Sequence, residues 1–521
     1  MEHQYTIFLQ NHQYKHFAIT CYNLQGKTGD GSLSYFSSLT KRLRIIIITS
    51  IIILIIIIGD IMEVFINRAD DLAFLQDQYN RAESSLVILY GRRRVGKTSL
   101  ISEFGRDKNM LYFLATEEHE AINRNQYKEL VAEFTNNELL KNSTVDNWEI
   151  IFNVLSQHQP KQRKLIVFDE FQYIGKSNPA FPSVFQKIWE SLKKQNVMVI
   201  LCGSLISLME AQTLAYDSPL YGRRTGQIKL KPIAFQHYHE FYDDKSEREL
   251  VEYYSVTGGV PKYIELFRGE ADIYTAIEKH VASTRSFLYE EPVFLLQREV
   301  SEVGSYFSLI RAIAAGNHKL SAISSAIGVK QTNLTKYLRT LIDLDIVERQ
   351  TPITESNPEK SKRGLYRIKD NFIDFWFKFI YPERGNLETG RTSQVMVKIR
   401  EGFIKHHVSY IYEEICRQQL WSDANDMKLP FHFNKVGRWW EKNNEIDIVA
   451  LHSAGTDIVF GECKYTNDPM DIGVFYKLFE KKDFVKWQNE ERNEFFVFFS
   501  INGYTNRMKA LAAENKNIFL L

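Results

Sequence analysis

The sequence predicts an α/β protein in which a parallel sheet and a helical lid precede a winged helix-turn-helix and a second α/β domain. Three observations lead to this order: an apolar strand that enters a G-x-x-x-x-G-K-T loop, a central helix-turn-helix pattern, and carboxylate-bearing strands near the end. A length of 521 residues agrees with about three domains. We expect the sheet at residues 62–235, the lid at 236–300, the winged helix at 301–381 and the last domain at 395–521.

The composition is that of a folded protein with balanced charge. Hydrophobic residues make up 44% of the chain, and 65 Lys and Arg residues face 64 Asp and Glu residues, for a net charge of +1. This balance excludes a histone-like tail protein, and a nucleic-acid surface would have to be a local patch. The four cysteines contain no C-x-x-C pair, which argues against a disulfide framework or a cysteine zinc site and favours the reducing cytoplasm.

Residues 1–61 do not follow the globular pattern. Within them Ile45–Ile58 is almost pure isoleucine and follows a basic stretch. The run is shorter than the ~20 residues that a spanning helix needs, and no small-x-small cleavage site follows it. We therefore expect residues 1–61 to be an over-long or disordered start, with a well-patterned sequence opening at Met62. A membrane anchor and a buried strand are the alternatives, and we do not expect a membrane among the partners of the protein.

A phosphate-binding loop follows the first predicted strand, Leu86–Tyr90. Its glycines let the backbone wrap around phosphates, so that N–H groups and the next helix N-terminus can bind the anion. Lys97 is expected to reach the β- and γ-phosphates, and the Thr98 hydroxyl to ligate Mg²⁺. The sequence alone does not show which way the three loop arginines point. The residues expected to bind ATP in this loop are Gly91, Arg92, Arg93, Arg94, Val95, Gly96, Lys97, Thr98 and Ser99.

A second strand, Lys164–Phe168, ends in two acidic residues. We expect Asp169 to hold Mg²⁺ through water and Glu170 to polarise the attacking water, which indicates hydrolysis of ATP. An exposed acidic strand end is the alternative. The strand-like segment Met110–Leu114 lies between the two motifs, and an additional strand there suits the division of phosphate-loop proteins that uses a catalytic glutamate.

Two further polar segments are candidates for sensing the nucleotide. The strand Val197–Cys202 would bring Ser204 to the same sheet edge, where it could sense the γ-phosphate or the water; a helix N-cap is an equal alternative. Arg223 or Arg224 could contact the γ-phosphate in cis or from a neighbouring subunit of a homo-oligomer. An exposed loop is the alternative for these arginines.

This set of motifs resembles the archaeal-type ATPases of the extended AAA+/STAND group. The resemblance implies a small helical lid after the ATPase core, in which a Gly-Gly-x-Pro turn helps to place nucleotide-sensing residues. It extends to the C-terminus. The stretches that carry it are Phe65–Leu72, Tyr90–Thr98, Phe168–Gln172, Cys202–Ser204 and Thr257–Tyr263.

The winged-helix region begins with a short helix, Leu320–Val329, that has a serine cap and a glycine stop. The next helix has one apolar face, and the polar stretch Thr351–Arg363 separates two strands as a long wing. The region carries 12 basic and 8 acidic residues. A rigid spacer or protein-contact module is the alternative to DNA contact. The expected DNA contacts are Gln331, Thr332 and Asn333 for a groove and Lys360, Lys362 and Arg363 for phosphates.

The last domain contains a second group of candidate catalytic residues. Period-two alternation places Glu445 and Asp447 on one strand face, and the next strand carries Glu462 and Lys464. Adjacent strands would bring Asp447, Glu462 and Lys464 together. Such carboxylates bind Mg²⁺ or Mn²⁺, which can activate water against a phosphodiester while Lys464 orients that water.

This D…E-x-K pattern resembles the restriction-endonuclease-like superfamily. In its Holliday-resolvase-like branch an upstream helix supplies another glutamate, and Glu413 matches that position as a further metal ligand. The leading hypothesis is therefore a Mg²⁺-dependent ATPase that acts on DNA and carries a metal-dependent nuclease domain. The alternatives are an ATP-driven switch that binds DNA or a protein partner and cuts nothing, and a membrane-anchored ATPase.

Overall fold

The computed structural model describes residues 5–8, 18–21, 65–488 and 491–521. The chain divides into two compact units, Met1–Phe65 and Ile66–Leu521. In the first unit β1 (Tyr5–Phe8) pairs antiparallel with β2 (Ala18–Cys21). The isoleucine run and the expected start at Met62 lie outside the described residues. Among the residues that are described, no helix has both the length and the apolar character to cross a bilayer.

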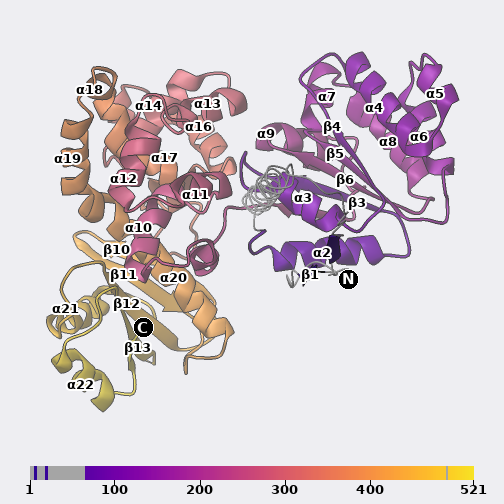
Figure 1. The fold of residues 1–521 in the computed structure, drawn as a ribbon. Helices are drawn as coiled ribbons and strands as arrows, with labels where there is room; N and C mark the ends of the chain where they lie inside the picture. Colours follow the sequence, from indigo (N-terminus) through magenta and orange to yellow (C-terminus); the bar gives the residue numbers. More distant parts are fainter. Residues whose placement is uncertain (1–4, 9–17, 22–64, 489–490) are drawn as a thin grey trace, which may run out of the picture. The chain divides into compact units, whose positions relative to one another are not determined.

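A five-stranded parallel sheet forms the centre of the second unit (Figure 1). The four predicted strands are confirmed to within about a residue. Met110–Leu114 forms the edge strand, and the strand inserted between β3 and β5 is β6, which comes later in the chain. In order across the sheet the strands are β4 (Met110–Leu114), β5 (Lys164–Asp169), β6 (Val197–Gly203), β3 (Ser85–Tyr90) and β7 (Gly226–Lys229).

Helices cover both faces of this sheet, which explains why β3, β5 and β6 are buried along their whole length and are apolar between their ends. Helices α2 and α3 lie on one face, and α4, α6 and α8 lie on the other (Figure 1). The helices of this part are α2 (Ala69–Asn80), α3 (Lys97–Gly105), α4 (Glu120–Thr135), α5 (Glu138–Asn142), α6 (Trp148–Gln157), α7 (Gln172–Ser177), α8 (Phe181–Leu192) and α9 (Ile206–Met209).

The region expected to be a lid is helical. Its first helix starts at a capping box between Ser246 and Glu249 and ends at Gly258, which has a φ of 59°. Gly259 also needs to be glycine, because a Cβ there would lie 1.9 Å from the carbonyl oxygen of Ile233. The predicted Gly-Gly-x-Pro turn is therefore fixed by close backbone contact. The helices are α10 (Glu247–Thr257), α11 (Pro261–Phe267), α12 (Ile273–Ile277) and α13 (Glu291–Glu299).

Three helices and an antiparallel hairpin follow, and the last two helices and the hairpin are those that the helix-turn-helix pattern predicts. Helix α15 ends at Gly328 in the left-handed conformation, but Ser321 lies inside the helix and is not its cap. Helix α16 buries its predicted apolar face through Leu334, Leu338 and Leu341. These elements are α14 (Val303–Ala314), α15 (Leu320–Ile327), α16 (Gln331–Asp343), β8 (Val347–Gln350) and β9 (Leu365–Ile368).

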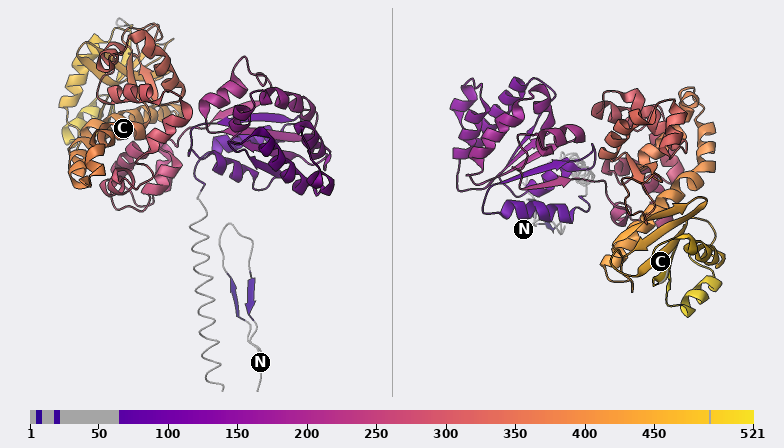
Figure 2. Two further views of the ribbon diagram at one scale, coloured as in Figure 1. Left: turned by 90° about the horizontal axis from the view of Figure 1, so that it is seen from above. Right: turned by 180° about the vertical axis from the view of Figure 1, so that it is seen from behind.

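Three helices, α17 (Asn371–Phe375), α18 (Arg384–Glu388) and α19 (Thr392–Phe403), lead to the last domain. There a mixed five-stranded sheet has α20 on one face and α21 on the other (Figure 2). The elements are α20 (Ser409–Asn425), β10 (Lys435–Glu441), β11 (Asn444–Leu451), β12 (Asp457–Lys464), α21 (Gly473–Lys481), β13 (Asn493–Ser500), α22 (Asn506–Glu514) and β14 (Ile518–Leu520).

A half-buried histidine makes the helix–hairpin region sensitive to acid. The backbone N–H of Tyr366 on β9 donates to the carbonyl oxygen of His318, and His318 Nδ1 lies 3.1 Å from the carbonyl oxygen of Tyr366. Burial, assisted by the Arg367 guanidinium, lowers the pKa of His318 to about 4. The unfolded chain therefore binds a proton below about pH 6.5 that the folded chain takes up only near pH 4. We predict that the free energy of unfolding falls by about 2 kcal/mol as the pH drops through this window.

Urea denaturation at pH 7, 5.5 and 4.5 measures this effect, and His318→Gln should reduce the slope. His432, which is exposed, provides the matched control as His432→Gln. Equal slopes in wild type and His318→Gln would contradict the prediction.

Candidate functional site

Three parallel strands deliver the predicted nucleotide-binding residues to one edge of the central sheet. The phosphate loop follows β3, Asp169 ends β5 and Glu170 comes directly after it, and Ser204 follows β6. The first loop glycine, Gly91, lies so close to the next segment that a Cβ would stand 2.4 Å from the carbonyl oxygen of Leu230. The sequence pattern therefore reflects a real restriction on the path of the loop.

Lys97 is folded into the loop that it belongs to. Its Nζ donates to the carbonyl oxygens of Gly91 at 2.8 Å and Arg92 at 2.9 Å. Burial lowers the pKa of Lys97. Gly96, with a φ of 93°, precedes the first residue of α3 and directs the helix N-terminus to the same place. A cationic amine and a helix N-terminus at one point suit the binding of phosphate groups.

The predicted Mg²⁺ ligands contact one another. The Thr98 hydroxyl donates to Asp169 Oδ2 at 3.2 Å, and the Tyr112 hydroxyl donates to the same oxygen at 2.6 Å. Burial, followed by the bond to Asp169, raises the pKa of Tyr112, which keeps this hydroxyl a proton donor. A hydroxyl and a carboxylate are oxygen ligands of the kind that Mg²⁺ prefers, so these residues fit the ion. Tyr112 was not identified from the sequence; the signal that could have identified it is a polar hydroxyl on a strand that pairs with the acidic strand β5.

Ser204 and Glu170 form a polar pair. The Ser204 hydroxyl donates to Glu170 Oε2 at 2.8 Å, and the Ser204 backbone N–H approaches the same oxygen at 3.3 Å. Gln172 donates to this oxygen as well. The alternative interpretation of Ser204 as a helix N-cap is wrong, because α9 starts after Leu205 and has no side-chain cap. The role of Ser204 as a sensor stays a prediction.

The loop arginines were expected among the phosphate-binding residues, but their side chains contact other protein groups. Arg92 forms an ion pair with Asp370, and both side chains are buried. Arg94 pairs with Glu291 and lies 4.0 Å from the centroid of the Phe287 ring. These carboxylates are far away in the sequence, which explains why spacing alone could not identify them. The third arginine, Arg93, donates to the Tyr173 hydroxyl at 2.8 Å.

Arg223 lies near the end of the sheet where β3 begins, whereas the phosphate loop lies where β3 ends. The backbone N–H of Thr225 donates to the carbonyl oxygen of Leu86 near the start of β3, five residues before Gly91. At 3.3 Å per residue this separation is about 16 Å. Contact with the γ-phosphate in cis therefore does not agree with the strand register. Arg223 instead approaches Glu190 at 3.4 Å, and contact from a neighbouring subunit stays a prediction.

The predicted residues of the last domain lie near one another. Asp447 is buried, and its Oδ2 accepts a bond from the backbone N–H of Cys463 at 3.1 Å. The Glu445 side chain is 64% exposed and lies 3.5 Å from Arg438. Between the pairs Gly437–Val449 and Trp439–Ile446, β11 has one residue more than β10, which forms a β-bulge after Ile446. Glu445 and Asp447 nevertheless both interact with the same group on α20, because Arg438 links Glu445 to Glu413 and the Asp447 charge acts on Glu413.

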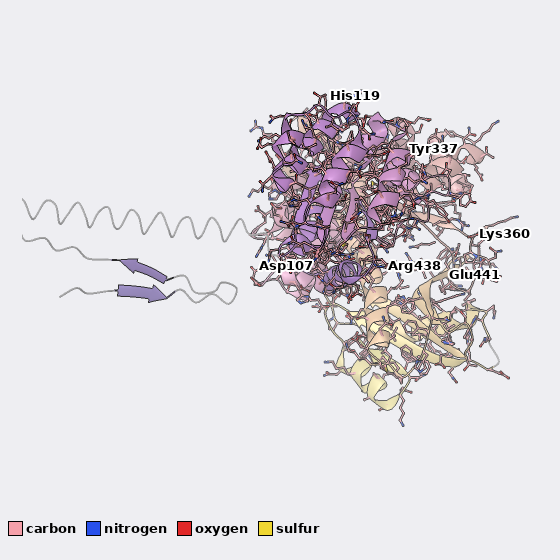
Figure 3. The ribbon with its side chains drawn as sticks, turned by 90° about the vertical axis from the view of Figure 1, so that its right-hand side faces the viewer. Asp107, His119, Tyr337, Lys360, Arg438 and Glu441 are labelled. Atoms are coloured by element: carbon pink, nitrogen blue, oxygen red, sulfur yellow. The ribbon has the colours of Figure 1, made fainter. Side chains whose placement is uncertain are left out.

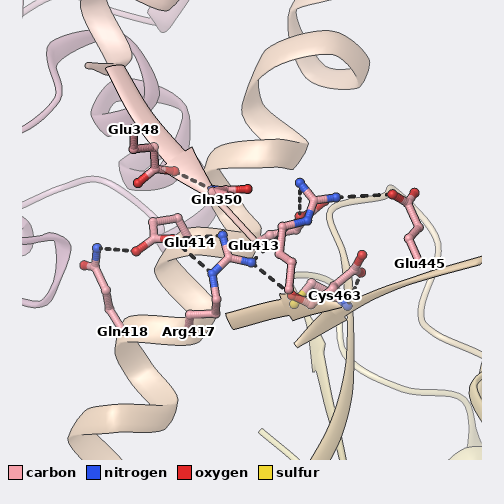
Figure 4. Close-up of polar contacts among 10 residues, drawn as sticks. Glu348, Gln350, Glu413, Glu414, Arg417, Gln418, Glu445 and Cys463 are labelled. Carbon is pink, nitrogen blue, oxygen red and sulfur yellow. Dashed lines mark hydrogen bonds and ion pairs between the residues drawn. The ribbon is translucent and has the colours of Figure 1, made fainter. Parts of the chain in front are cut away.

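Two further carboxylates, Glu413 and Glu462, interact with Asp447, and Figure 4 shows the surroundings of Glu413. Burial, followed by the Asp447 charge, raises the pKa of Glu413 to about 7 and also raises the pKa of Glu462. Glu462 Oε1 accepts from Lys464 at 2.6 Å, and Glu413 Oε2 lies 3.5 Å from Arg438. One oxygen of Glu413 and one of Glu462 are buried without a hydrogen-bond partner.

These two oxygens face protein cations without a hydrogen bond, Glu413 facing Arg438 and Glu462 facing Lys481. The carboxylates have the chemistry of Mg²⁺ or Mn²⁺ ligands. As arranged, however, no three His, Cys, Asp or Glu residues in the described ranges are grouped to hold a metal ion together. Arg438 and Arg417 stand near Glu413, at 3.5 and 4.0 Å. The donors therefore fit a metal by type but are not assembled around one point.

The helix–hairpin region presents its predicted DNA-contacting residues to solvent. Gln331, Thr332 and Asn333 are exposed at the start of α16. Lys360 is exposed on the loop between β8 and β9 (Figure 3). Arg363 is also exposed, but it pairs with Glu355 of the same loop. This loop is anchored where the backbone N–H of Ile353 donates to the carbonyl oxygen of Arg438 at 3.0 Å.

Known proteins share these features. Residues 65–267 match a family described as an ATPase domain predominantly from Archaea, and residues 376–494 match a family of archaeal and bacterial proteins of unknown function. An uncharacterized protein of Methanocaldococcus jannaschii is 35% identical over 432 residues, which cover 82% of this chain and 94% of the relative. An uncharacterized ATP-binding protein of the same organism is 50% identical over 46 residues, 9% of this chain and 78% of its own.

Two solved structures are also similar. The Walker-type ATPase of Pyrococcus abyssi is 20% identical, with a TM-score of 0.48, over 61% of this chain and 97% of its own. A signal-transduction ATPase with numerous domains and a tetratricopeptide repeat sensor, from Pyrococcus horikoshii, is 15% identical, with a TM-score of 0.30, over 70% of this chain and 51% of its own. The parallel sheet, the loop and the flanking helices have the P-loop NTPase fold.

The buried Arg92–Asp370 pair should matter strongly for stability. Asp370→Asn keeps the shape of the side chain but leaves the Arg92 guanidinium buried without its counter-charge. We predict a loss of about 3 kcal/mol in the free energy of unfolding, measured by urea denaturation.

The exposed pair Glu117–Lys176 provides the control, since Glu117→Gln should cost less than about 1 kcal/mol. A similar small loss for both variants would show that Arg92 does not depend on Asp370.

Proposed function

Because the chain belongs to the family of ATPases found predominantly in Archaea, we propose that it hydrolyses ATP with Mg²⁺ and acts on DNA. The observation that carries the proposal is the convergence of Lys97, Thr98, Asp169 and Glu170 at one sheet edge. These residues supply a phosphate-binding amine, two oxygen groups for the metal ion and a carboxylate that can act on water.

Each residue has a distinct role in this proposal. The loop backbone and Lys97 bind the phosphates, and Thr98 with Asp169 would hold Mg²⁺, which neutralises charge on the β- and γ-phosphates. Glu170 orients the attacking water, and Ser204 holds the Glu170 carboxylate through the 2.8 Å bond. Tyr112 fixes the Asp169 carboxylate from the neighbouring strand.

The action on DNA rests on the helix–hairpin region, which we propose is a winged helix. The polar start of α16 is exposed, and residues 301–381 have a net charge of +4. We propose that Gln331, Thr332 and Asn333 face a DNA groove while Lys360 and Lys362 contact phosphates. In this proposal the protein is cytoplasmic, and a homo-oligomer would allow Arg223 of one copy to approach the nucleotide of the next.

Variants of Glu170 and Lys97 distinguish the binding of ATP from its hydrolysis. We predict that Glu170→Gln retains binding of a fluorescent ATP analogue and lowers kcat by about 10²- to 10⁴-fold, since it removes the base but not the phosphate ligands. Lys97→Ala should lose both nucleotide binding and hydrolysis, because the loop then lacks its amine.

Glu129→Gln is the matched control, because Glu129 is exposed on α4. Wild-type turnover by Glu170→Gln would show that another group acts on the water.

A metal-dependent nuclease is the second candidate function. The buried carboxylates of Glu413 and Glu462, each with one oxygen that makes no hydrogen bond, lie around Asp447 and favour it. We propose that Glu413, Asp447 and Glu462 would hold Mg²⁺ or Mn²⁺ and that Lys464 would orient the water. The alternative within this proposal is an ATP-driven switch with an inactive nuclease-like domain, in which Arg438 keeps its place beside Glu413.

A cleavage assay distinguishes these two forms. We predict that the full chain with Mn²⁺ nicks linear, branched or single-stranded DNA and that Asp447→Asn abolishes cleavage, since the central carboxylate charge is lost. ATP hydrolysis should be unchanged in this variant. Absence of cleavage by wild type while ATP is still hydrolysed would support the switch.

A further inference from the structure

Aromatic rings and lysines crowd the outer surface of α21 and the turn that follows it. Leu478 and Val485 face the sheet and are fully buried. Tyr476, Phe479 and Phe484 are nevertheless 54%, 44% and 48% exposed. Large apolar rings that remain outside a helix with an established buried face indicate a contact surface. We call this surface the α21 platform; it comprises Tyr476, Phe479, Phe484, Lys477, Lys481, Lys482 and Lys486.

Rings beneath the platform hold it in place. The Phe479 ring centroid lies 5.6 Å from that of Phe475 and 5.8 Å from that of Phe496 on β13. Tyr476 lies 5.5 Å from Phe475, measured between the same points. The exposed rings are therefore supported from the core, which reduces the entropy lost when a flat partner stacks on them.

The basic charge of the platform comes from Lys477 and Lys486, since Lys481 is paired with Glu462 and Lys482 with Asp483 and Glu494. Four lysines lie between residues 473 and 488, against Glu480 and Asp483. Lys477 and Lys486 are exposed. Lys482 Nζ lies 4.7 Å from the Phe479 centroid and 3.0 Å from Asp483 Oδ1, so this acid is already paired. Basic groups interleaved with exposed rings suit a partner that carries both phosphates and flat faces.

The platform continues into the carboxylate cluster of the last domain. Lys481 Nζ lies 3.8 Å from Glu462 Oε2, and Lys464 Nζ lies 2.6 Å from the other oxygen of the same carboxylate. A chain that crosses the platform would therefore reach the edge of the candidate nuclease site.

We propose that the α21 platform binds single-stranded DNA, with bases stacked on Tyr476 and Phe479 and phosphates held by Lys477 and Lys486. This inference rests on the proposed action on DNA and adds a second surface, separate from α16. Bases in a duplex are covered by their neighbours, whereas a single strand offers base faces to aromatic side chains. A protein partner fits less well, because lysine is depleted in the cores of protein interfaces.

The experiment is fluorescence anisotropy of the full chain with an oligothymidylate of about 20 nucleotides and with a duplex of the same length. Tyr476→Ala should weaken binding of the single strand by about five- to 150-fold, with duplex binding changed less than about twofold. Tyr476→Phe should bind like wild type, because it keeps the ring. The double variant Lys477→Ala, Lys486→Ala should reduce the salt slope for the single strand by about 1.4.

Tyr216→Ala is the matched control, since Tyr216 is an exposed tyrosine of the ATPase core, and ATP hydrolysis verifies that each variant is folded. Equal weakening of single-strand and duplex binding by Tyr476→Ala would overturn the platform. So would tighter binding of oligouridylate than of oligothymidylate. If the proposed function itself is wrong, the result is different: the wild-type protein neither binds duplex DNA nor hydrolyses ATP.

Discussion

The ATP site depends on one constraint, which is that neighbouring parallel strands end at the same edge of the sheet. Leu114 lies beside Asp169, Phe168 beside Leu201, and Tyr90 beside Gly203. This register places the residue after each strand within reach of the others. The bonds from Thr98 and Tyr112 to Asp169 and from Ser204 to Glu170 follow from it. A change of one residue in the register would direct these side chains to the opposite face.

The phosphate loop is also connected to later parts of the chain. Arg92 pairs with Asp370, which caps α17 through a 2.7 Å bond from the backbone N–H of Ile373, and Arg94 pairs with Glu291 of α13. These carboxylates are buried, so their charges depend on the arginines. A different conformation of the loop must therefore alter contacts at both α13 and α17.

Much of the fold could be predicted from local patterns. The strands Met110–Leu114 and Lys164–Phe168, and the carboxylates at the end of β5, could be predicted from hydrophobic runs and motif spacing alone. Features set by pairing could not be predicted in this way. The bulge that follows Ile446 depends on how β10 pairs with β11, and the position of Arg223 depends on the register of β7 against β3.

Contacts between residues far apart in the sequence were the other feature that could not be predicted. Nothing near Arg92 identifies Asp370 as its counter-charge, because 278 positions separate them. Tyr112 was a partial exception, since a polar hydroxyl on an edge strand beside the acidic strand is a signal that pairing arguments could use. The ATP site was thus predictable in its backbone motifs and less so in the side chains that hold those motifs in place.

The most direct test of the account is the steady-state rate of ATP hydrolysis by the full chain, with and without duplex DNA. We predict that ATP hydrolysis requires Mg²⁺ and that its rate rises several-fold when duplex DNA is added. Mg²⁺-dependent hydrolysis that is unaffected by duplex DNA at any concentration would contradict the proposed action on DNA. Absence of hydrolysis under all conditions would contradict the assignment of Glu170.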